Sequence, residues 1–362
     1  MADEKIKPGR VEGKNSEHRS GGGFIPKKLN NEIEVVLQAN RDKAAHQEKK
    51  VGCRTQDIRE TVIRGFFSDM YHLKYKIESI QNLKEKHLIA VFGFLEEQGQ
   101  SPATIQNKIS IMRTFCGWIG KNGMVRDSTL YVKDKASVRR SMVASEDKSW
   151  SGHGIDVLAK LPEIAKKDKW VALYLELCWA FGLRMQEALM LKPRLAHEGE
   201  FIWVREGTKG DRPRVIPIEN DIQRDVLERA KQAADGKSGF LCKRGSSVVQ
   251  RRRRFYTVME ALGITLSEAG VTAHGLRHQY MQESFKLLLG IDAPVKGGDL
   301  SQVGKGELYV ASQKLVERAG HSRISIGAAY YGSRRIPKEL RVGVALSEQG
   351  QPVWTGDIDG VR

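Results

Sequence analysis

The 362-residue sequence lacks the features that mark secreted, disulfide-bonded or membrane-spanning chains. Its four cysteines are far apart and form no Cys-x-x-Cys pair, which argues against a disulfide framework and a structural zinc site. They are Cys53, Cys116, Cys178 and Cys242. No apolar run approaches the length of a membrane span, and the charged start, MADEKIKPGR, lacks the apolar core of a signal peptide. We therefore expect an intracellular, cytoplasmic protein without a membrane partner.

Acidic residues are also in deficit. Sixty Lys and Arg against 44 Asp and Glu leave a formal net charge of +16 at pH 7. An excess of this size favours a polyanionic partner such as a nucleic acid. With 40% hydrophobic residues over 362 positions, the chain can bury two separate cores.

The expected fold is mainly α with a small β-hairpin or sheet (α+β), and residue patterns divide the chain into five segments. These are a flexible arm (1–50), a small helical domain (51–122), a linker (123–150), a larger domain (151–335) and a tail (336–362). The arm is polar and glycine-rich, and we expect at most one short helix in it, near residues 31–40. The linker combines dense charge with Gly and Ser and has no helical period.

Three amphipathic helices are expected in the small domain. The first covers 55–73, the second 83–98 after an Asn82 cap, and the third follows Ser101-Pro102. The inward stripe of the first helix is read as Ile58, Val62, Phe66, Met70 and Leu73. Four basic residues of this domain and the linker could contact nucleic-acid phosphates, but they could equally be solvent-exposed charges without a partner. They are Lys108, Arg113, Arg139 and Arg140.

The larger domain opens with a strongly apolar stretch over 168–180, which predicts a buried helix, and Gly182 ends it before a second helical segment through residue 191. Two β-rich stretches, 201–205 and 214–218, predict a hairpin with Lys209 at or near its tip. Asn220 can cap the next helix, which is expected to end near residue 234. A basic run opens another helix through residue 262, and its Arg251 and Arg252 are further candidates for contact with nucleic acid.

The most distinctive stretch is His274-Gly275-Leu276-Arg277-His278. In a helix that continues to about Gly290, the two imidazoles lie one turn apart with the guanidinium beside them. Arginine binds phosphate oxygens with a fixed fork of donors, and histidine can donate to such an oxygen or move a proton near neutral pH. After a loop-like stretch over 291–310, a short helix is expected over 313–319. One more short helix is expected over 337–346.

Taken together, the order and spacing of these motifs resemble the tyrosine recombinase (phage integrase) family. The motifs that carry the resemblance are Gly182-Leu183-Arg184-x-x-Glu187, the hairpin Lys209, His274-x-x-Arg277-His278, Gly320-His321-Ser322 and a tyrosine nine residues after His321, Tyr330. They span about residues 168–332, and the helical domain before them also fits. The resemblance implies that the small domain is a core-type DNA-binding domain and the larger one a catalytic domain.

The resemblance also implies a role for each motif residue. Arg184 and Arg277 would grip the non-bridging oxygens of a scissile phosphodiester, with His274 and His321 as further donors. Lys209 would be the general acid for the 5′-hydroxyl leaving group and Tyr330 the nucleophile. His278 would be a general base or orienting group, and Glu187 a structural partner.

This chemistry needs no cofactor and no metal, because positioned cations can stabilise charge on the phosphate and a phosphotyrosine conserves the bond energy. Neither a carboxylate cluster near these motifs nor a Walker-type loop is present in the sequence. The sequence departs from the family in three respects. Residues 291–310 look like an insertion, Tyr331 could replace Tyr330 if the register shifts, and Gln279-Tyr280-Met281 stand in place of Thr-Phe-Ala.

We therefore expect a bacterial, nucleoid-associated recombinase that integrates or excises a mobile element through a Holliday junction. Its partners would be double-stranded DNA sites, three further copies of itself on synapsed DNA, and accessory DNA-bending or directionality proteins; the free protein would be a monomer or weak oligomer. Two alternatives stay open: a nicking-closing enzyme like type IB topoisomerases, and a non-catalytic DNA-binding regulator. The tail could dock into a neighbouring protomer or fold back on its own domain.

Overall fold

The computed structural model describes residues 24–43, 50–133, 135, 143–210 and 212–333, together with two strands at 343–346 and 352–355. The chain divides into two compact units, with the boundary between residues 140 and 141. The predicted DNA contacts Arg139 and Arg140 lie outside the described residues, as does the start of the expected arm, 1–23.

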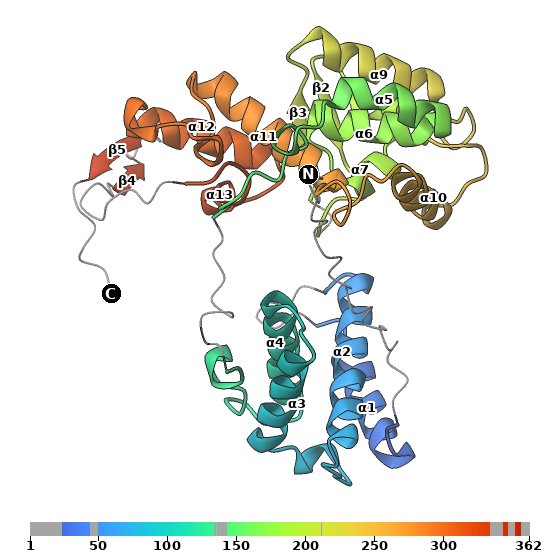
Figure 1. Cartoon of the computed structure of the whole chain (residues 1–362), viewed down its shortest axis with the longest axis vertical. Coiled ribbons are helices and arrows are strands. Elements are labelled where there is room, and N and C mark those ends of the chain that lie inside the picture. The colour runs from blue at the N-terminus through green and yellow to red at the C-terminus, as the bar shows by residue number, and fades with distance from the viewer. Residues whose placement is uncertain are drawn as a thin grey trace, which may run out of the picture. The chain divides into compact units, whose positions relative to one another are not determined.

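The first unit is a helical bundle (Figure 1). Its helices are α1 (Lys27–Asn40), α2 (Cys53–His72), α3 (Glu85–Glu97) and α4 (Pro102–Trp118). The prediction of a flexible arm is wrong for α1, because Leu29, Ile33 and Leu37 repeat at helical spacing and are buried in the core of the unit. This helix begins earlier than the short helix expected near residues 31–40 and makes the bundle four-helical.

Within the bundle, Ser101 caps α4 as predicted, since its side chain accepts a hydrogen bond from the backbone N–H of Thr104. Asn82 is not the cap of α3, because it ends a short 3-10 helix and Lys84 occupies the capping position. The inward stripe of α2 is also shifted. Ile58 is exposed, and Ile63 and Phe67 are buried beside the predicted Phe66 and Met70.

The second unit is mostly helical around a small sheet (Figure 1). Its helices are α5 (Val157–Lys167), α6 (Lys169–Phe181), α7 (Met185–Leu189), α8 (Pro193–Ala196), α9 (Asp221–Ala233), α10 (Val248–Ala261), α11 (Ala273–Leu289), α12 (Lys305–Arg318) and α13 (Ala328–Tyr331). The apolar α6 is buried between α5, α9 and α11, as its composition predicted. Asn220 caps α9 through a hydrogen bond from the Gln223 backbone, also as predicted.

The sheet contains the predicted hairpin and one additional short strand. Strands β1 (His197–Glu198), β2 (Phe201–Val204) and β3 (Arg214–Pro217) are antiparallel in that order. Val204 pairs with Arg214 at the end where the hairpin loop carries Lys209. Ile202, Val204 and Ile216 are buried, so one face of the hairpin rests on the core.

Both ends of the predicted linker are packed rather than exposed. Val125, Tyr131 and Val132 belong to the core of the first unit. Trp150 is fully buried in the core of the second unit, and its indole N–H donates to the carbonyl of Thr272 at 2.9 Å. Apolar residues in a charged stretch were the available sign of this packing.

Two predictions in the C-terminal part are wrong. The second half of the expected insertion is helical, because α12 begins at Lys305 rather than near residue 313. Residues 343–346 form a strand, β4, that pairs with β5 (Pro352–Thr355), where a helix over 337–346 was expected. Residues 337–342 lie outside the described residues. Among the helices that the structure describes, none is long and apolar enough to cross a membrane.

Candidate active site

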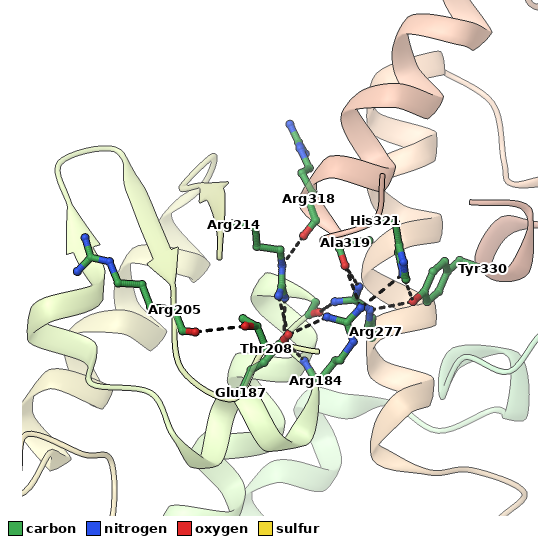
Figure 2. A network of polar contacts seen from close by, with 11 residues as sticks. Arg184, Glu187, Arg205, Thr208, Arg214, Arg277, Arg318, Ala319, His321 and Tyr330 are labelled. Carbon is green, nitrogen blue, oxygen red and sulfur yellow. Dashed lines mark hydrogen bonds and ion pairs between the residues drawn. The ribbon is translucent and has the colours of Figure 1, made fainter. Parts of the chain in front are cut away.

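The site motifs come from separate elements of the second unit that converge on one centre (Figure 2). Gly182 ends α6 with φ of 58°, a left-handed conformation that glycine adopts without strain, and the chain turns so that Arg184 caps α7. Arg277 lies on α11, His321 lies three residues after the end of α12, and Tyr330 lies on α13. These residues span nearly 150 positions of the sequence, and the fold brings them together.

A buried carboxylate organises the arginines of this centre. Glu187 is fully buried, and its oxygens accept hydrogen bonds from Arg184 Nη1 at 2.7 Å and from Arg214 Nη1 and Nη2 at 2.6 and 2.7 Å (Figure 2). A further bond from the Arg184 backbone N–H, also 2.7 Å, fixes the start of α7. Burial raises the pKa of the Glu187 carboxyl, but the hydrogen bonds and charges of the arginines outweigh burial and hold it at about 2.

Arg277 is almost fully buried, and backbone carbonyls hold its guanidinium in place. Nη1 donates to the carbonyl of Gly182 at 2.5 Å, and Nη2 donates to the carbonyl of Ala319. Arg184 Nη2 donates to the same Ala319 carbonyl at 3.1 Å, so the two guanidiniums flank one acceptor. Burial lowers the pKa of Arg277 to about 10, which leaves it a cation at neutral pH. Two cations fixed side by side form a receptor for an anion.

The phenol of Tyr330 lies inside this centre. Its hydroxyl oxygen accepts from Arg277 Nε at 3.2 Å and lies 3.1 Å from Nε2 of His321 (Figure 2). The ring of His278 lies 5.0 Å from the Tyr330 ring, and that of His274 lies 5.9 Å away. Tyr331 points elsewhere, because its ring packs on Phe285 at 4.9 Å. The geometry therefore places Tyr330, and not its neighbour, beside the arginines.

Lys209 is exposed on the loop between β2 and β3, and that loop rests on α7. Gly207 has φ of 72°, and a Cβ there would lie 2.7 Å from the carbonyl oxygen of Gln186, so only glycine allows this approach. Thr208 closes the loop through a hydrogen bond from its hydroxyl to the carbonyl of Arg205 at 3.3 Å (Figure 2). The charge of Lys209 is among those that lower the pKa of His321. The lysine is thus close enough to the centre for its charge to act on His321, while its side chain stays exposed.

The imidazoles of the centre are neutral at pH 7. Burial lowers the pKa of His278 to about 4, with contributions from Lys148 and Arg277. Burial and then Arg277 and Arg184 lower the pKa of His321 to about 4 as well. The pKa of His274 is lowered in the same direction by desolvation and by His278, although this residue keeps an exposed edge, where water weakens the effect. Each neutral ring can donate one hydrogen bond and accept one.

Two of the predicted DNA contacts are held by backbone carbonyls of their own units. Arg113 donates to the backbone carbonyls of Val125 and Arg126 at 3.2 and 2.7 Å, and the buried Arg251 donates to that of Leu189 at 2.6 Å. These guanidiniums therefore stabilise the fold through backbone contacts. Lys108 is partly buried near Asp69, and desolvation lowers its pKa. Arg252 is partly exposed on α10.

Three residues that contact the motif residues were missed by the sequence reasoning. Arg214 is the buried partner of Glu187. It is a charged residue at an inward-facing position of strand β3, and this could have indicated a buried ion pair. Gln282 donates to Oδ1 of Asp147 and to the backbone carbonyl of Tyr330, so Asp147 reaches the Tyr330 segment through Gln282. Gln282 lies one turn after His278, on the same face of α11, which could have drawn attention to it. The sequence held no comparable sign for Asp147.

No group of three or more His, Cys, Asp or Glu side chains that could hold a metal ion occurs within the part of the chain that the structure describes. The donors that converge here are mainly cationic or neutral nitrogens. Such a set suits an anion with several oxygens rather than a cation.

Comparison with known proteins gives matches to both units. A family model described as "Phage integrase, N-terminal" matches residues 28–125, and one described as "Integrase" matches residues 138–283. The second match includes Arg184, Lys209 and the His274–His278 stretch and ends before His321 and Tyr330.

Similar proteins come from both sequence and structure comparison. Tyrosine recombinase XerC from Corynebacterium efficiens is 26% identical over 285 residues, which cover 73% of this chain and 86% of that protein. A lambda integrase dimer bound to a core site is similar in fold, with a TM-score of 0.55 at 13% identity over 85% of this chain and 96% of the other. The Tn1549 transposon integrase in complex with a circular intermediate DNA gives a TM-score of 0.56 at 16% identity over 84% and 96%.

Proposed function

Because this chain belongs to the tyrosine recombinase (phage integrase) family, we propose that it cuts and rejoins DNA at specific sites through a 3′-phosphotyrosine intermediate on Tyr330. The observation that carries the proposal is the position of the Tyr330 hydroxyl, which lies within hydrogen-bond distance of Arg277 and His321. A phosphodiester bound by the two fixed guanidiniums would lie beside this phenol, in a position where the phenolic oxygen could attack phosphorus. The family and its recombinase class are established by the matches above; the residue roles are part of the proposal.

In the proposed reaction, Arg184 and Arg277 bind the two non-bridging oxygens of the scissile phosphate. Negative charge grows on these oxygens as the Tyr330 oxygen attacks phosphorus, so fixed cations favour the transition state over the ground state. The new bond joins the phenolic oxygen to phosphorus, and the bond from phosphorus to the 5′-oxygen breaks. His274 and His321 lie where they can add hydrogen bonds to the same phosphate.

Two protons must move in this step. Lys209 on its exposed loop supplies one to the leaving 5′-oxygen, and the phenolic proton leaves to a neutral imidazole. His321 Nε2 is 3.1 Å from the hydroxyl, which puts it within reach as an acceptor. The His278 ring packs at a tilt against the Tyr330 ring, 5.0 Å between centroids, and would act as a general base or orienting group. Glu187 holds Arg184 and Arg214 and stays ionised, which fits a structural role rather than that of an acid. The reverse step rejoins the strand without any other energy source.

A basic surface on the second unit supports DNA as the substrate. A cavity of about 790 Å³ lies where α6 and α10 begin, and its lining includes Lys167, Lys169, Lys243 and Arg244. Asp168, the one carboxylate in the described lining, is paired with Arg254 at 2.7 Å. Together with the net charge of +16, this basic surface favours contact of the second unit with a DNA backbone.

We further propose that four protomers exchange strands between two DNA duplexes through a Holliday junction, for the integration or excision of a mobile element. The similar lambda integrase is described on a core site and the similar Tn1549 integrase on a circular intermediate, which supports this reading. Accessory DNA-bending or directionality proteins would act with them. The competing activity is nicking and closing by single protomers, as in type IB topoisomerases.

The deciding experiment uses nicked suicide substrates drawn from the ends of the DNA element that encodes the protein. After cleavage such a substrate loses a short strand, so the covalent complex accumulates and is seen as a shifted band in a denaturing gel. Absence of an adduct with DNA that the protein binds would contradict the proposal. A two-site recombination assay beside a supercoil-relaxation assay then separates recombination from nicking and closing.

A further inference from the structure

The segment that carries Tyr330 is too short to hold its own position. Helix α13 has only four residues, and Tyr330 donates its backbone N–H within that turn, to the carbonyl of Gly327 at 2.8 Å. An isolated turn of this length is not stable in water. Something outside α13 must therefore fix the backbone from which the phenol projects.

Gln282 makes that contact. It is 2% exposed, and its Nε2 donates to the backbone carbonyl oxygen of Tyr330 at 3.3 Å and to Oδ1 of Asp147 at 2.8 Å. Both neighbours are acceptors, so the amide can only face them with its two N–H groups, and its orientation is determined. His274, His278 and Gln282 lie at successive turns of α11, which presents one continuous face to the Tyr330 segment.

Asp147 anchors this amide from the other side. Its Oδ1 also accepts the backbone N–H of Ser149 at 2.9 Å, and its Oδ2 lies 3.8 Å from Nζ of Lys296. Burial raises the pKa of the Asp147 carboxyl, but the hydrogen bonds from Ser149 and Gln282 and the charge of Lys296 together lower it below its usual value. The carboxylate is thus an anion at neutral pH, and a charged acceptor holds an amide more firmly than a neutral one.

A second contact fixes the start of the same helix. The backbone N–H of Ala144 donates to the carbonyl of Ala328 at 2.9 Å. The stretch 144–147 therefore holds α13 at two points, once directly and once through Gln282. Neither contact involves the phenolic oxygen of Tyr330 or the guanidiniums of Arg184 and Arg277.

We propose that Gln282 is a positioning residue for the nucleophile and that Asp147 is its anchor. This inference rests on the proposed role of Tyr330. A tyrosine side chain has two rotatable bonds, so the place of its hydroxyl follows from the place of its backbone. A shift of the reacting atom by about 1 Å can cost roughly 100-fold in rate. Loss of the Gln282 contact reduces the rate of attack and leaves DNA binding intact.

The test compares Gln282→Leu with Gln279→Leu on nicked suicide substrates at saturating DNA. Gln279 is the matched control because it is a buried amide on the same helix that donates to Glu283 and accepts from the Ser151 backbone rather than contacting Tyr330. The expected result is adduct formation about 10- to 100-fold slower for Gln282→Leu, with an unchanged Kd and a near-normal rate for Gln279→Leu. A normal rate for Gln282→Leu, or equal loss in both variants, would overturn the proposal.

A second variant, Asp147→Asn, keeps the proposal testable if Gln282→Leu does not fold. It retains a side-chain oxygen in place of the charged acceptor, so we expect a smaller loss, roughly 3- to 10-fold. In the double variant Asp147→Asn with Gln282→Leu, the loss should equal that of Gln282→Leu alone, because both act through one contact. Independent, multiplying losses would contradict a shared role. If the wild-type protein forms no adduct at all, the proposed function fails rather than this inference.

Discussion

Arg214 and Glu187 form a doubly hydrogen-bonded ion pair whose side chains are both almost completely shielded from water. The pair ties strand β3 to the start of α7, and Arg214 Nε also donates to the carbonyl of Arg318 at the end of α12, at 2.7 Å. One carboxylate thus balances two guanidiniums, those of Arg184 and Arg214, and connects three elements that meet at the site (Figure 2).

We expect Glu187→Gln to destabilise the protein by about 3 kcal/mol, because it removes one partner of a buried pair and leaves the arginines uncompensated. Urea unfolding followed by circular dichroism measures this. The control is Glu200→Gln, which breaks the exposed pair with Arg224 and should leave stability nearly unchanged, because water and salt screen such a pair. Equal effects of the two substitutions would mean that the buried pair contributes nothing particular to stability.

Tyr330→Phe should bind DNA as the wild type does and form no covalent adduct, because the nucleophilic oxygen is gone. Tyr331→Phe is its control and should still form the adduct, since the Tyr331 ring packs on Phe285. Peptide mapping of the trapped complex identifies the modified residue. DNA attached to Tyr331 would refute the assignment of the nucleophile.

Arg184→Ala and Arg277→Ala should each lower the rate of adduct formation by about 10²- to 10³-fold while changing affinity far less. Each removes charge stabilisation from the transition state, whereas most binding comes from other contacts along the duplex. Arg205→Ala is the matched control, because Arg205 is exposed and pairs with Glu198. Parallel losses of rate and affinity would make Arg184 and Arg277 ordinary phosphate contacts.

Stability should fall as the solution is acidified from about pH 6.5 toward pH 4. Burial holds the pKa of His278 at about 4 against an ordinary value of 6.5, so the unfolded chain binds a proton more readily between these values. The stabilising effect is complete above pH 6.5 and is lost as pH falls through 4; the partly buried His321 acts in the same sense. Thermal unfolding as a function of pH tests this, and His278→Gln should show a flatter profile. An identical slope in that variant would contradict the assignment.

Truncation after Gly332 tests whether the tail serves assembly. We expect the truncated protein to cleave a nicked half-site at a normal rate, because the motif residues all precede the cut. Recombination between two full sites should be lost if the tail docks into a neighbouring protomer. Unchanged recombination would instead show that the tail is dispensable.

Periodicity and motif spacing predicted much of this structure. The buried α6, the hairpin and the helix that carries His274 and Arg277 all have strong local sequence patterns. In each case the tertiary packing agrees with the structure that the local pattern favours. A short helix was expected near residues 31–40 of the arm, but its start at Lys27 and its packing into the core were missed, because the flanking polar sequence obscured three well-spaced apolar residues. The strand at 343–346 was misread as helix because a short apolar run fits either period.

Site residues could be predicted from the sequence only where the type of residue itself suggested a chemical role. Arg184, Arg277, His321 and Tyr330 could be named from order and spacing, but their mutual distances depend on how separate elements pack. Arg214, Gln282 and Asp147 act through contacts 27 to 135 positions apart in sequence, and no local pattern encodes such pairings.

The hydroxyl of Tyr330 and the guanidinium of Arg277 that contacts it belong to the same polypeptide. A single copy thus carries both the proposed nucleophile and the proposed phosphate receptor, and no exchange of segments between copies is needed to bring this pair together. In kinetic terms, adduct formation on an occupied half-site should be first order in the protein–DNA complex and independent of any excess of free protein. Strand exchange, in contrast, requires encounters between complexes and should slow on dilution.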